Sequence, residues 1–323
     1  MDNSLLELKD AKMYYSVKVR EKGKFFAEHK FVRAVDGVSF TVKKGTTLGI
    51  VGESGCGKST VGKMIVKLLH PTSGSIYYEG KDIFTLTKEE DRQFKEKVQI
   101  IFQDPYSSLD PCFCVGRIIA EPMVGRGYTA EQQRNRVLGL MQEVGMKEDQ
   151  YGRYPHEFSG GQRQRIGIAR ALALNPELVV CDEPVSALDV SIQAQVLNLM
   201  QQLRQKHHLT YVFISHNLSV VKYFCDEIVV MYLGNIVERA KKDELFRNYQ
   251  HPYTEALLYA VPVPDPDVES MQNIIAGEVP STMEEIQGCV FSSRCKFASK
   301  ECREQRPALK EICPGHFVAC HKR

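Results

Sequence analysis

The segment GESGCGKST, residues 52–60, constrains the fold more than any other part of the sequence. It matches the pattern G-x-x-x-x-G-K-[ST], follows the apolar segment TLGIV, and leads into a run with helical periodicity that ends near Leu69. Glycines let successive backbone N–H groups turn towards phosphate oxygens, and a helix N-terminus adds partial positive charge. Because strand, loop and helix occur in this order, the sequence predicts a phosphate-binding loop in an α/β protein.

The residues of this loop have different predicted roles. Lys58 is expected to reach the β- and γ-phosphates of a nucleotide, and Ser59 to ligate Mg²⁺. Cys56 would make the loop sensitive to alkylation. The other residues expected to contact the nucleotide are Gly52, Ser54, Gly55, Gly57 and Thr60, together with Cys56 itself.

An acidic pair follows a second apolar segment, LVVCDEP. Asp182 ends this predicted strand and is placed to hold Mg²⁺, while Glu183 is placed to polarise an attacking water as a general base. Alone, the pair would be read as an ordinary turn at a strand end. The phosphate loop upstream favours the catalytic interpretation.

Strands and helices alternate after the acidic pair. The helical run IQAQVLNLMQQLRQKH is followed by a third apolar strand, TYVFISH, from Thr210. This alternation indicates a mostly parallel sheet with helices on both faces. Between Gln103 and Phe158 the pattern becomes helical, which predicts a helical insertion at about 104–158.

The chain is expected to divide near residue 250. Beyond His251 the segment AVPVPDPDVES holds Pro262, Pro264 and Pro266, which is typical of an extended linker. We therefore predict a nucleotide-binding domain over residues 1–250 and a C-terminal extension over 251–323.

Composition excludes some classes of protein. The 42 basic and 40 acidic residues give a net charge of +2, which does not indicate a strongly basic nucleic-acid-binding domain. The first residues show no secretory signal, and no apolar run approaches the roughly 20 residues needed to cross a bilayer. We expect a chain that is soluble by itself and cytosolic.

The segment FSGGQRQRIGIARAL, residues 158–172, resembles the signature motif of ATP-binding-cassette (ABC) ATPases, with Phe158 in place of the usual leucine. Its small residues would allow close backbone approach at a helix N-terminus and so form a second anion site. In that family two subunits pack head to tail, and the signature of one covers the ATP held by the other. The resemblance therefore places four residues against a partner's nucleotide: Ser159, Gly160, Gly161 and Gln162.

Other family motifs occur in the expected order. Gln103 in IFQDP matches the glutamine that senses Mg²⁺ and water, and Asp189 ends SALD, which matches a loop at the dimer interface. His216 in FISHNL matches the switch histidine that contacts the γ-phosphate, although alone it would be read as an ordinary strand-end histidine. Tyr14, with Tyr15 as the alternative, matches the aromatic residue that stacks on adenine.

Further segments narrow the resemblance. IFQDPYSSLDP, HPYTEALLYAVP and GCVFSSRC with the following RPAL and GHFVACH resemble ATPase subunits of dipeptide and oligopeptide transporters, and the match covers nearly the whole chain. Residues 15–33 resemble an N-terminal insertion found in one of the two ATPase types that such transporters pair. The resemblance implies a P-loop ABC cassette, with a RecA-like core of mostly parallel sheet plus antiparallel strands, a helical insertion and a small Cys-rich C-terminal domain.

The resemblance also implies a function and a set of partners. The chain would hydrolyse ATP to power uptake of di- or oligopeptides, on the cytoplasmic face of the cell (inner) membrane as a peripheral subunit. Its partners would be a homologous ATPase subunit in a heterodimer, two transmembrane permease subunits and an extracytoplasmic peptide-binding protein, with no nucleic acid.

Three alternatives to this function are kept. Nickel importers belong to the same group, so the solute is less certain than the family. A soluble ABC ATPase of DNA repair or translation would usually carry a coiled-coil insertion or two cassettes, and neither is seen. The third alternative is an ATPase whose Cys-rich tail acts as a redox sensor.

Five of the ten cysteines lie in the last 35 residues. In a reducing compartment such a group binds metal or does redox chemistry more often than it forms disulfides. Structural zinc sites prefer C-x₂₋₄-C spacing, which the first three of these cysteines lack, although His316 and His321 would be available as ligands.

Iron–sulfur clusters need four thiolates and tolerate varied spacing, and Pro314 follows Cys313 as a proline follows one ligand in bacterial ferredoxins. The family resemblance implies that such tails can hold a four-iron four-sulfur cluster. The ligands expected here are Cys289, Cys295, Cys302 and Cys320, with Cys313 as the spare. A zinc site and a metal-free tail remain alternatives.

Overall fold

The structure is a computed structural model that describes residues 4–19, 28–260, 280–281, 283 and 286–323. Two features predicted from the sequence lie largely outside these residues. The centre of the segment that resembles an N-terminal insertion, and the prolines of the predicted linker (Pro262, Pro264 and Pro266), lie outside the described residues.

The chain forms two compact units, which are described one at a time. Unit 1 comprises residues 1–42, 48–84 and 215–323, and unit 2 comprises residues 43–47 and 85–214. Unit 1 therefore contains the phosphate loop and the Cys-rich tail, whereas unit 2 contains the acidic pair and the signature segment.

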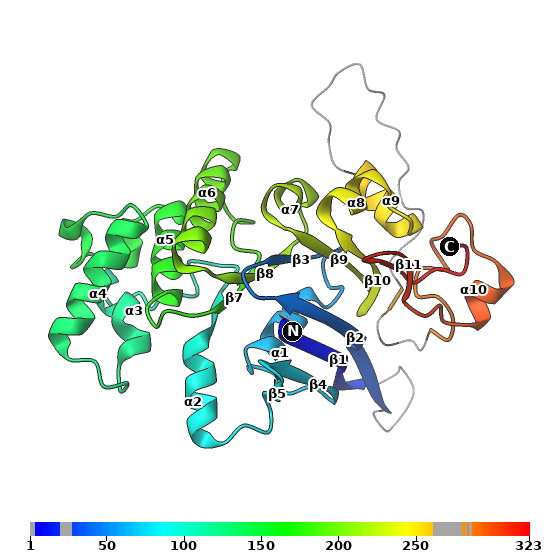
Figure 1. Ribbon diagram of the computed structural model, residues 1–323, viewed down its shortest axis with the longest axis horizontal. Coiled ribbons are helices and arrows are strands. Elements are labelled where there is room, and N and C mark those ends of the chain that lie inside the picture. Colours follow the sequence, from blue (N-terminus) through cyan, green and yellow to red (C-terminus); the bar gives the residue numbers. More distant parts are fainter. Residues whose placement is uncertain (1–3, 20–27, 261–279, 282, 284–285) are drawn as a thin grey trace, which may run out of the picture. The chain divides into compact units, whose positions relative to one another are not determined.

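Both units mix strands and helices (Figure 1). The elements assigned to unit 1 are β1 (Ser4–Val19), β2 (Glu28–Lys43), β3 (Thr47–Val51), α1 (Lys58–Ile65), β4 (Ser73–Tyr78), β5 (Lys81–Asp82), α7 (Leu218–Phe224), β9 (Glu227–Tyr232), β10 (Asn235–Lys241), α8 (Lys242–Arg247), α9 (Pro252–Tyr259), α10 (Lys300–Glu304), β11 (Lys310–Cys313) and β12 (His316–Val318). Those of unit 2 are α2 (Lys88–Lys97), β6 (Val98–Ile101), α3 (Val115–Ala120), η1 (Glu121–Met123), α4 (Ala130–Glu143), η2 (Glu148–Gln150), η3 (Pro155–Glu157), α5 (Gly160–Ala171), β7 (Leu178–Asp182), α6 (Val190–His207) and β8 (Thr210–Ser215). None of these helices is long and apolar enough to span a membrane.

Unit 1 contains an antiparallel sheet with strand order β2-β1-β4-β5. Alternate residues of a strand share one face, and in β1 the alternating Leu6 and Leu8 are buried opposite Tyr78 and Ile76 of β4. The alternation of apolar and polar residues in this part of the sequence therefore produces a sheet with one face in the core.

The other strands of unit 1 lie in the order β11-β12-β10-β9-β3. β3 and β9 pair in parallel, and every residue of β3 is buried, as expected for a strand covered on both faces. β10 runs antiparallel to β9.

The Cys-rich tail adds the last two strands to this sheet. β12 pairs antiparallel with β10, with Phe317 opposite Arg239, and β11 pairs with β12 (Figure 1). Backbone hydrogen bonds therefore join the end of the chain to the nucleotide-binding core. The division into residues 1–250 and 251–323 stays a prediction.

In unit 2, β6, β7 and β8 form parallel pairs in the order β8-β7-β6. Residues 104–158, predicted as a helical insertion, hold α3, α4 and three short 3₁₀ helices, and α3 packs against α4 and α5. α4 begins with a capping box, in which Thr129 and Gln132 each satisfy a backbone N–H of the other residue.

Candidate functional site

The phosphate loop joins the end of β3 to the start of α1, as predicted. Gly57 is the N-cap residue of α1 and has φ +103°. A Cβ atom at this position would lie 2.2 Å from the carbonyl oxygen of Ala34, and one on Gly52 would lie 2.2 Å from that of Met231. Both glycines are needed because the loop passes directly against neighbouring backbone.

Lys58 folds back over the loop that precedes it. Its ammonium group donates to the carbonyl oxygens of Gly52 (2.8 Å) and Glu53 (2.9 Å), and the side chain is buried. Cys56 is also buried, and burial raises the pKa of its thiol. A buried, protonated thiol reacts slowly, so the structure disfavours the alkylation sensitivity expected from the sequence.

Glu53, the second residue of the loop, is held by two elements far away in the sequence. Its backbone N–H donates to the hydroxyl oxygen of Tyr253 in α9 (2.8 Å). Its carboxylate accepts from Arg294 Nη1 at 2.9 and 3.3 Å, and the Arg294 side chain is only 7% exposed. Arg294 lies just before Cys295, so the Cys-rich tail contacts the phosphate loop directly.

An aromatic cluster supports these two contacts. Tyr232, Tyr253 and Phe291 have ring centroids 4.7–5.4 Å apart, and Arg294 also donates to the Tyr232 hydroxyl (3.3 Å). Tilted aromatic pairs at this separation attract one another beyond simple burial. In the sequence, HPY and SSRC contribute only to the family resemblance. Nothing in their spacing indicates that they contact the phosphate loop.

Tyr14 belongs to a second polar cluster of unit 1. Its hydroxyl donates to Asp36 at 2.5 Å, and Arg306 donates to the other oxygen of Asp36 at 2.8 Å. Burial and the Asp36 hydrogen bond raise the pKa of Tyr14 to about 12. Burial opposes ionisation of Asp36, but the hydrogen bonds from Tyr14 and Arg306 outweigh it and lower the pKa of that carboxyl.

This cluster borders a pocket of about 370 Å³. The side chains around it include Tyr14, Arg33, Asp36 and Arg306, so it is mostly polar and charged. Tyr15, the alternative adenine contact, is not among them and is 36% exposed.

In unit 2, Gln103 and Glu183 are in contact. The side-chain amide of Gln103 donates to Glu183 Oε2 at 3.0 Å. Glu183 follows β7 with φ +46°, a strained conformation for a residue with a Cβ atom, and its N–H donates to Ile214 O (3.0 Å). Asp182, the last residue of β7, is buried. The strand end therefore fixes the direction of both acidic residues.

The signature segment begins α5. Ser159 is the N-cap residue and forms a capping box with Gln162. A Cβ atom on Gly161 would lie 2.4 Å from Ile192 Cγ2 in α6, so this glycine is required by helix packing within unit 2. Asp189 is the N-cap residue of α6, and Ser186 in the same loop donates to Glu183 O at 3.0 Å.

His216 is the first residue after β8. It belongs to unit 1 and is exposed. Asn217, the next residue, caps α7 by accepting from two backbone N–H groups. The turn after β8 is thus defined by a cap, which keeps the preceding histidine at the strand end.

The cysteines of the tail separate into two groups. The backbone N–H of Cys289 donates to Cys302 O at 2.7 Å. Burial, together with the neighbouring thiols of Cys302, Cys320 and Cys295, raises the pKa of the Cys289 thiol to about 11. Cys313 lies elsewhere, beside Glu244 and His316.

Family models and individual relatives both match this chain to ATP-binding proteins of ABC transporters. Residues 35–186 match the family model "ABC transporter", and residues 237–302 match "Oligopeptide/dipeptide transporter, C-terminal region". The chain is 51% identical to the oligopeptide transport ATP-binding protein AppF of Bacillus subtilis, covering 98% of this chain and 97% of the relative. It is 48% identical to the dipeptide transport ATP-binding protein DppF of Escherichia coli (99% and 95% covered) and 49% identical to the oligopeptide transport ATP-binding protein OppF of Salmonella typhimurium (98% and 96% covered).

A solved structure gives the same fold. A dimeric post-hydrolysis state of the ATP-binding cassette MJ0796 bound to ADP and Pi is 26% identical, with a TM-score of 0.63 over 73% of this chain and 98% of that one. This likeness confirms the predicted P-loop α/β fold with mixed sheets and helices.

Tyr14, which borders the pocket, and Tyr15, which does not, give a testable difference. We predict that Tyr14→Ala weakens ATP binding about tenfold, because stacking on a base contributes roughly 1–3 kcal/mol, whereas Tyr15→Ala has little effect. Tyr14→Phe keeps the ring and should bind nearly as well as the unchanged protein. Isothermal titration calorimetry with ATP measures all three. A larger loss in Tyr15→Ala than in Tyr14→Ala would contradict the assignment.

Proposed function

The chain belongs to the ABC transporter family of ATP-binding subunits, in its oligopeptide and dipeptide branch, and from this we propose that it powers uptake of di- or oligopeptides through partner permeases. It is an ATPase of the cassette type. The observation that carries the peptide assignment is identity of about 50% along nearly the whole chain with proteins named for dipeptide and oligopeptide transport. The nickel and redox-sensor alternatives have no such support.

The proposed hydrolytic residues centre on Glu183. Glu183 would act as general base for the water that attacks the γ-phosphate. Gln103, whose side-chain amide donates to Glu183 at 3.0 Å, would orient the Glu183 carboxylate and this water. His216 would contact the γ-phosphate from the turn after β8.

Nucleotide and metal would be held by the loop and the strand end. Mg²⁺, when bound, neutralises charge on the β- and γ-phosphates. The side chains that would hold it are Ser59, Gln103 and the buried carboxylate of Asp182, whose oxygens are the kind of donor that Mg²⁺ prefers. Lys58 would exchange its bonds to loop carbonyls for bonds to phosphate oxygens.

The signature segment would act on a second subunit's nucleotide. Ser159, Gly160, Gly161 and Gln162 stand at the N-terminus of a twelve-residue helix, where backbone N–H groups and the helix dipole favour an anion. Asp189 occupies the N-cap position of the neighbouring helix α6 without a side-chain capping hydrogen bond. We propose a head-to-tail heterodimer with a homologous ATPase, in which each chain completes the other's site.

The remaining partners and the location follow from the same premise. Two transmembrane permeases and an extracytoplasmic peptide-binding protein would complete the importer, and the chain would work as a peripheral subunit on the cytoplasmic face of the inner membrane. The relatives named as transport ATP-binding proteins support this membrane association.

We also propose a four-iron four-sulfur cluster on Cys289, Cys295, Cys302 and Cys320. The pKa values of the Cys289 and Cys295 thiols are raised, first by burial and then by the nearby thiols of Cys302 and Cys320, so the four cysteines lie close together. In the described chain, no three or more of these four thiols have their sulfur atoms within 4.8 Å of one another, as the ligands of a single ion would. A cluster is larger than one ion, so this spacing favours iron–sulfur over zinc at these four cysteines.

The cluster would serve as a structural staple. The tail is too short to bury a core of its own, and metal binding can replace part of that missing stability. Arg294 lies between two of the proposed ligands, so a cluster would hold it against Glu53. The Cys-rich region as a separate small domain remains part of this proposal.

Glu183→Gln tests the proposed function. In the complex assembled with its permeases and peptide-binding protein, we predict that this change lowers ATP hydrolysis and peptide uptake together by at least about 100-fold, the lower end of general-base contributions, while ATP still binds. Glu148→Gln, at a surface 3₁₀ helix, is the control and should leave both activities unchanged. Retained hydrolysis would contradict the base assignment. Hydrolysis without peptide uptake in the unaltered complex would contradict the peptide assignment.

The proposed cluster predicts which cysteine variants of the protein retain iron. After anaerobic purification, Cys295→Ser should lose bound iron and the visible absorbance of an iron–sulfur centre, whereas Cys313→Ser should keep both. Iron and acid-labile sulfide analysis together with absorbance spectroscopy measure this. Iron-free anaerobic wild-type protein, or loss of iron only in Cys313→Ser, would refute the proposed ligand set.

A further inference from the structure

The hairpin at the end of the chain brings a thiol and an imidazole together. Cys313 ends β11 and His316 begins β12, and the two are paired across a turn formed by Pro314 and Gly315. Gly315 has φ +78°, which such a tight turn requires of its glycine. Directly opposed residues of an antiparallel pair have Cβ atoms roughly 5 Å apart. The turn therefore holds the two side chains next to each other.

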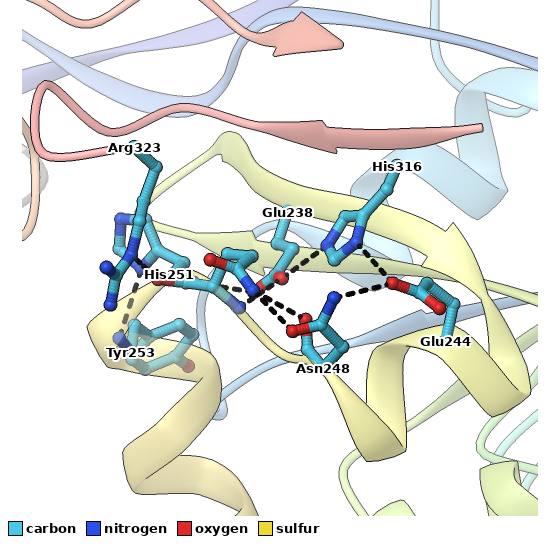
Figure 2. Close-up of polar contacts among 8 residues, drawn as sticks. Glu238, Glu244, Asn248, His251, Tyr253, His316 and Arg323 are labelled. Atoms are coloured by element: carbon cyan, nitrogen blue, oxygen red, sulfur yellow. Dashed lines mark hydrogen bonds and ion pairs between the residues drawn. The ribbon is translucent and has the colours of Figure 1, made fainter. Parts of the chain in front are cut away.

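His316 is fixed from one side by a buried carboxylate (Figure 2). Its Nε2 lies 2.7 Å from Glu238 Oε1, and both side chains are completely buried. Glu238 also accepts the backbone N–H groups of Gln250 (2.7 Å) and His251 (3.0 Å). Both oxygens of Glu238 thus act as acceptors, and in the matching tautomer Nε2 of His316 carries the proton and donates to Oε1.

The other ring nitrogen of His316 is buried and makes no hydrogen bond. Nδ1 forms an ion pair with Glu244 Oε1 in α8 at 3.5 Å, which is too long for a good hydrogen bond (Figure 2). Glu244 is itself oriented by Asn248, whose amide donates to the same oxygen at 2.9 Å. A buried polar atom without a hydrogen bond is costly unless something else satisfies it.

Three metal-ligating groups of different chemistry lie close together here. The Sγ of Cys313, a ring nitrogen of His316 and a carboxylate oxygen of Glu244 all lie within 4.8 Å of one another. Among the residues that the structure describes, no other group of three or more histidines, cysteines and acidic residues converges in this way. The three ligand atoms come from three elements, β11, β12 and α8.

We propose that Cys313, His316 and Glu244 bind a single divalent transition-metal ion of the zinc class. Thiolate, imidazole and carboxylate are the donors that zinc uses, and three protein ligands leave one position for water. The Glu238–His316 pair matches the arrangement in which a ligating histidine donates its second N–H to a carboxylate, which fixes the ring and strengthens the ligand. This site shares no ligand with the four-cysteine group.

The ion would join the C-terminal hairpin to α8 within unit 1. Glu244 belongs to α8, which follows β10 directly, whereas Cys313 and His316 belong to the tail. A metal bridge between these elements would supplement the pairing of β12 with β10. The rival reading is a protonated His316 that forms ion pairs with both Glu238 and Glu244 and leaves Cys313 free.

Cobalt(II) distinguishes the two readings in the full-length protein. A cobalt ion bound to a thiolate shows charge-transfer absorption, and zinc should displace it. We expect one cobalt per chain with this absorption in the chelator-treated wild type. Cys313→Ser should remove the thiolate absorption, and Glu244→Gln should weaken cobalt affinity about 10–100-fold, as changes around metal sites do. Cys112→Ser, which alters an exposed cysteine in unit 2, is the matched control and should bind like the wild type.

Each other outcome rejects the site. Cobalt absorption that persists in Cys313→Ser would come from the four-cysteine group, and wild-type protein without thiolate-bound cobalt would favour the protonated His316. Glu244 is partly exposed and its replacement is nearly isosteric, so Glu244→Gln should stay folded, as circular dichroism would verify. Unchanged cobalt affinity in folded Glu244→Gln would also overturn the proposed ligand set.

Discussion

The conformation of the phosphate loop depends on contacts made to Glu53. A glycine-rich loop loses much conformational entropy when it is ordered, so external contacts must hold it. Here Tyr253 accepts the backbone N–H of Glu53, and Arg294 pairs with its carboxylate. Tyr232 and Phe291 pack between these two contacts. The C-terminal third is therefore part of the support of the nucleotide site.

The tail that carries Arg294 needs support of its own. It joins the sheet of unit 1 through β12, and Arg306 reaches Asp36 at the pocket that Tyr14 borders. Among its described residues few large apolar side chains are buried, so a cluster on four cysteines and an ion beside His316 would each replace part of the core that these residues lack. Its cysteines and basic residues then have a common explanation: the thiols fix the tail, and arginines connect it to the nucleotide-binding unit.

The elements and motifs were predictable because local sequence carries their signal. The phosphate loop lies between a strand and a helix as expected, and the contact of Gln103 with Glu183 unites two residues singled out separately. Arg294 and Glu53 are 241 positions apart, and their pairing leaves no periodicity or spacing to detect. The sequence prediction leaves Cys313 as the spare thiol, and only the hairpin register reveals its proximity to His316.

A double-mutant cycle on ATP affinity tests the central claim that the tail supports the phosphate loop through Glu53. Without Arg294, the Glu53 carboxylate would be left partly buried and unpaired beside the phosphates. The account predicts that Arg294→Gln weakens ATP binding roughly tenfold when Glu53 is present and has little effect in Glu53→Gln, a coupling of about 1–2 kcal/mol. The exposed pair Lys296 and Glu255 provides a control cycle that should show almost none. Equal effects of Arg294→Gln in both backgrounds would contradict the account.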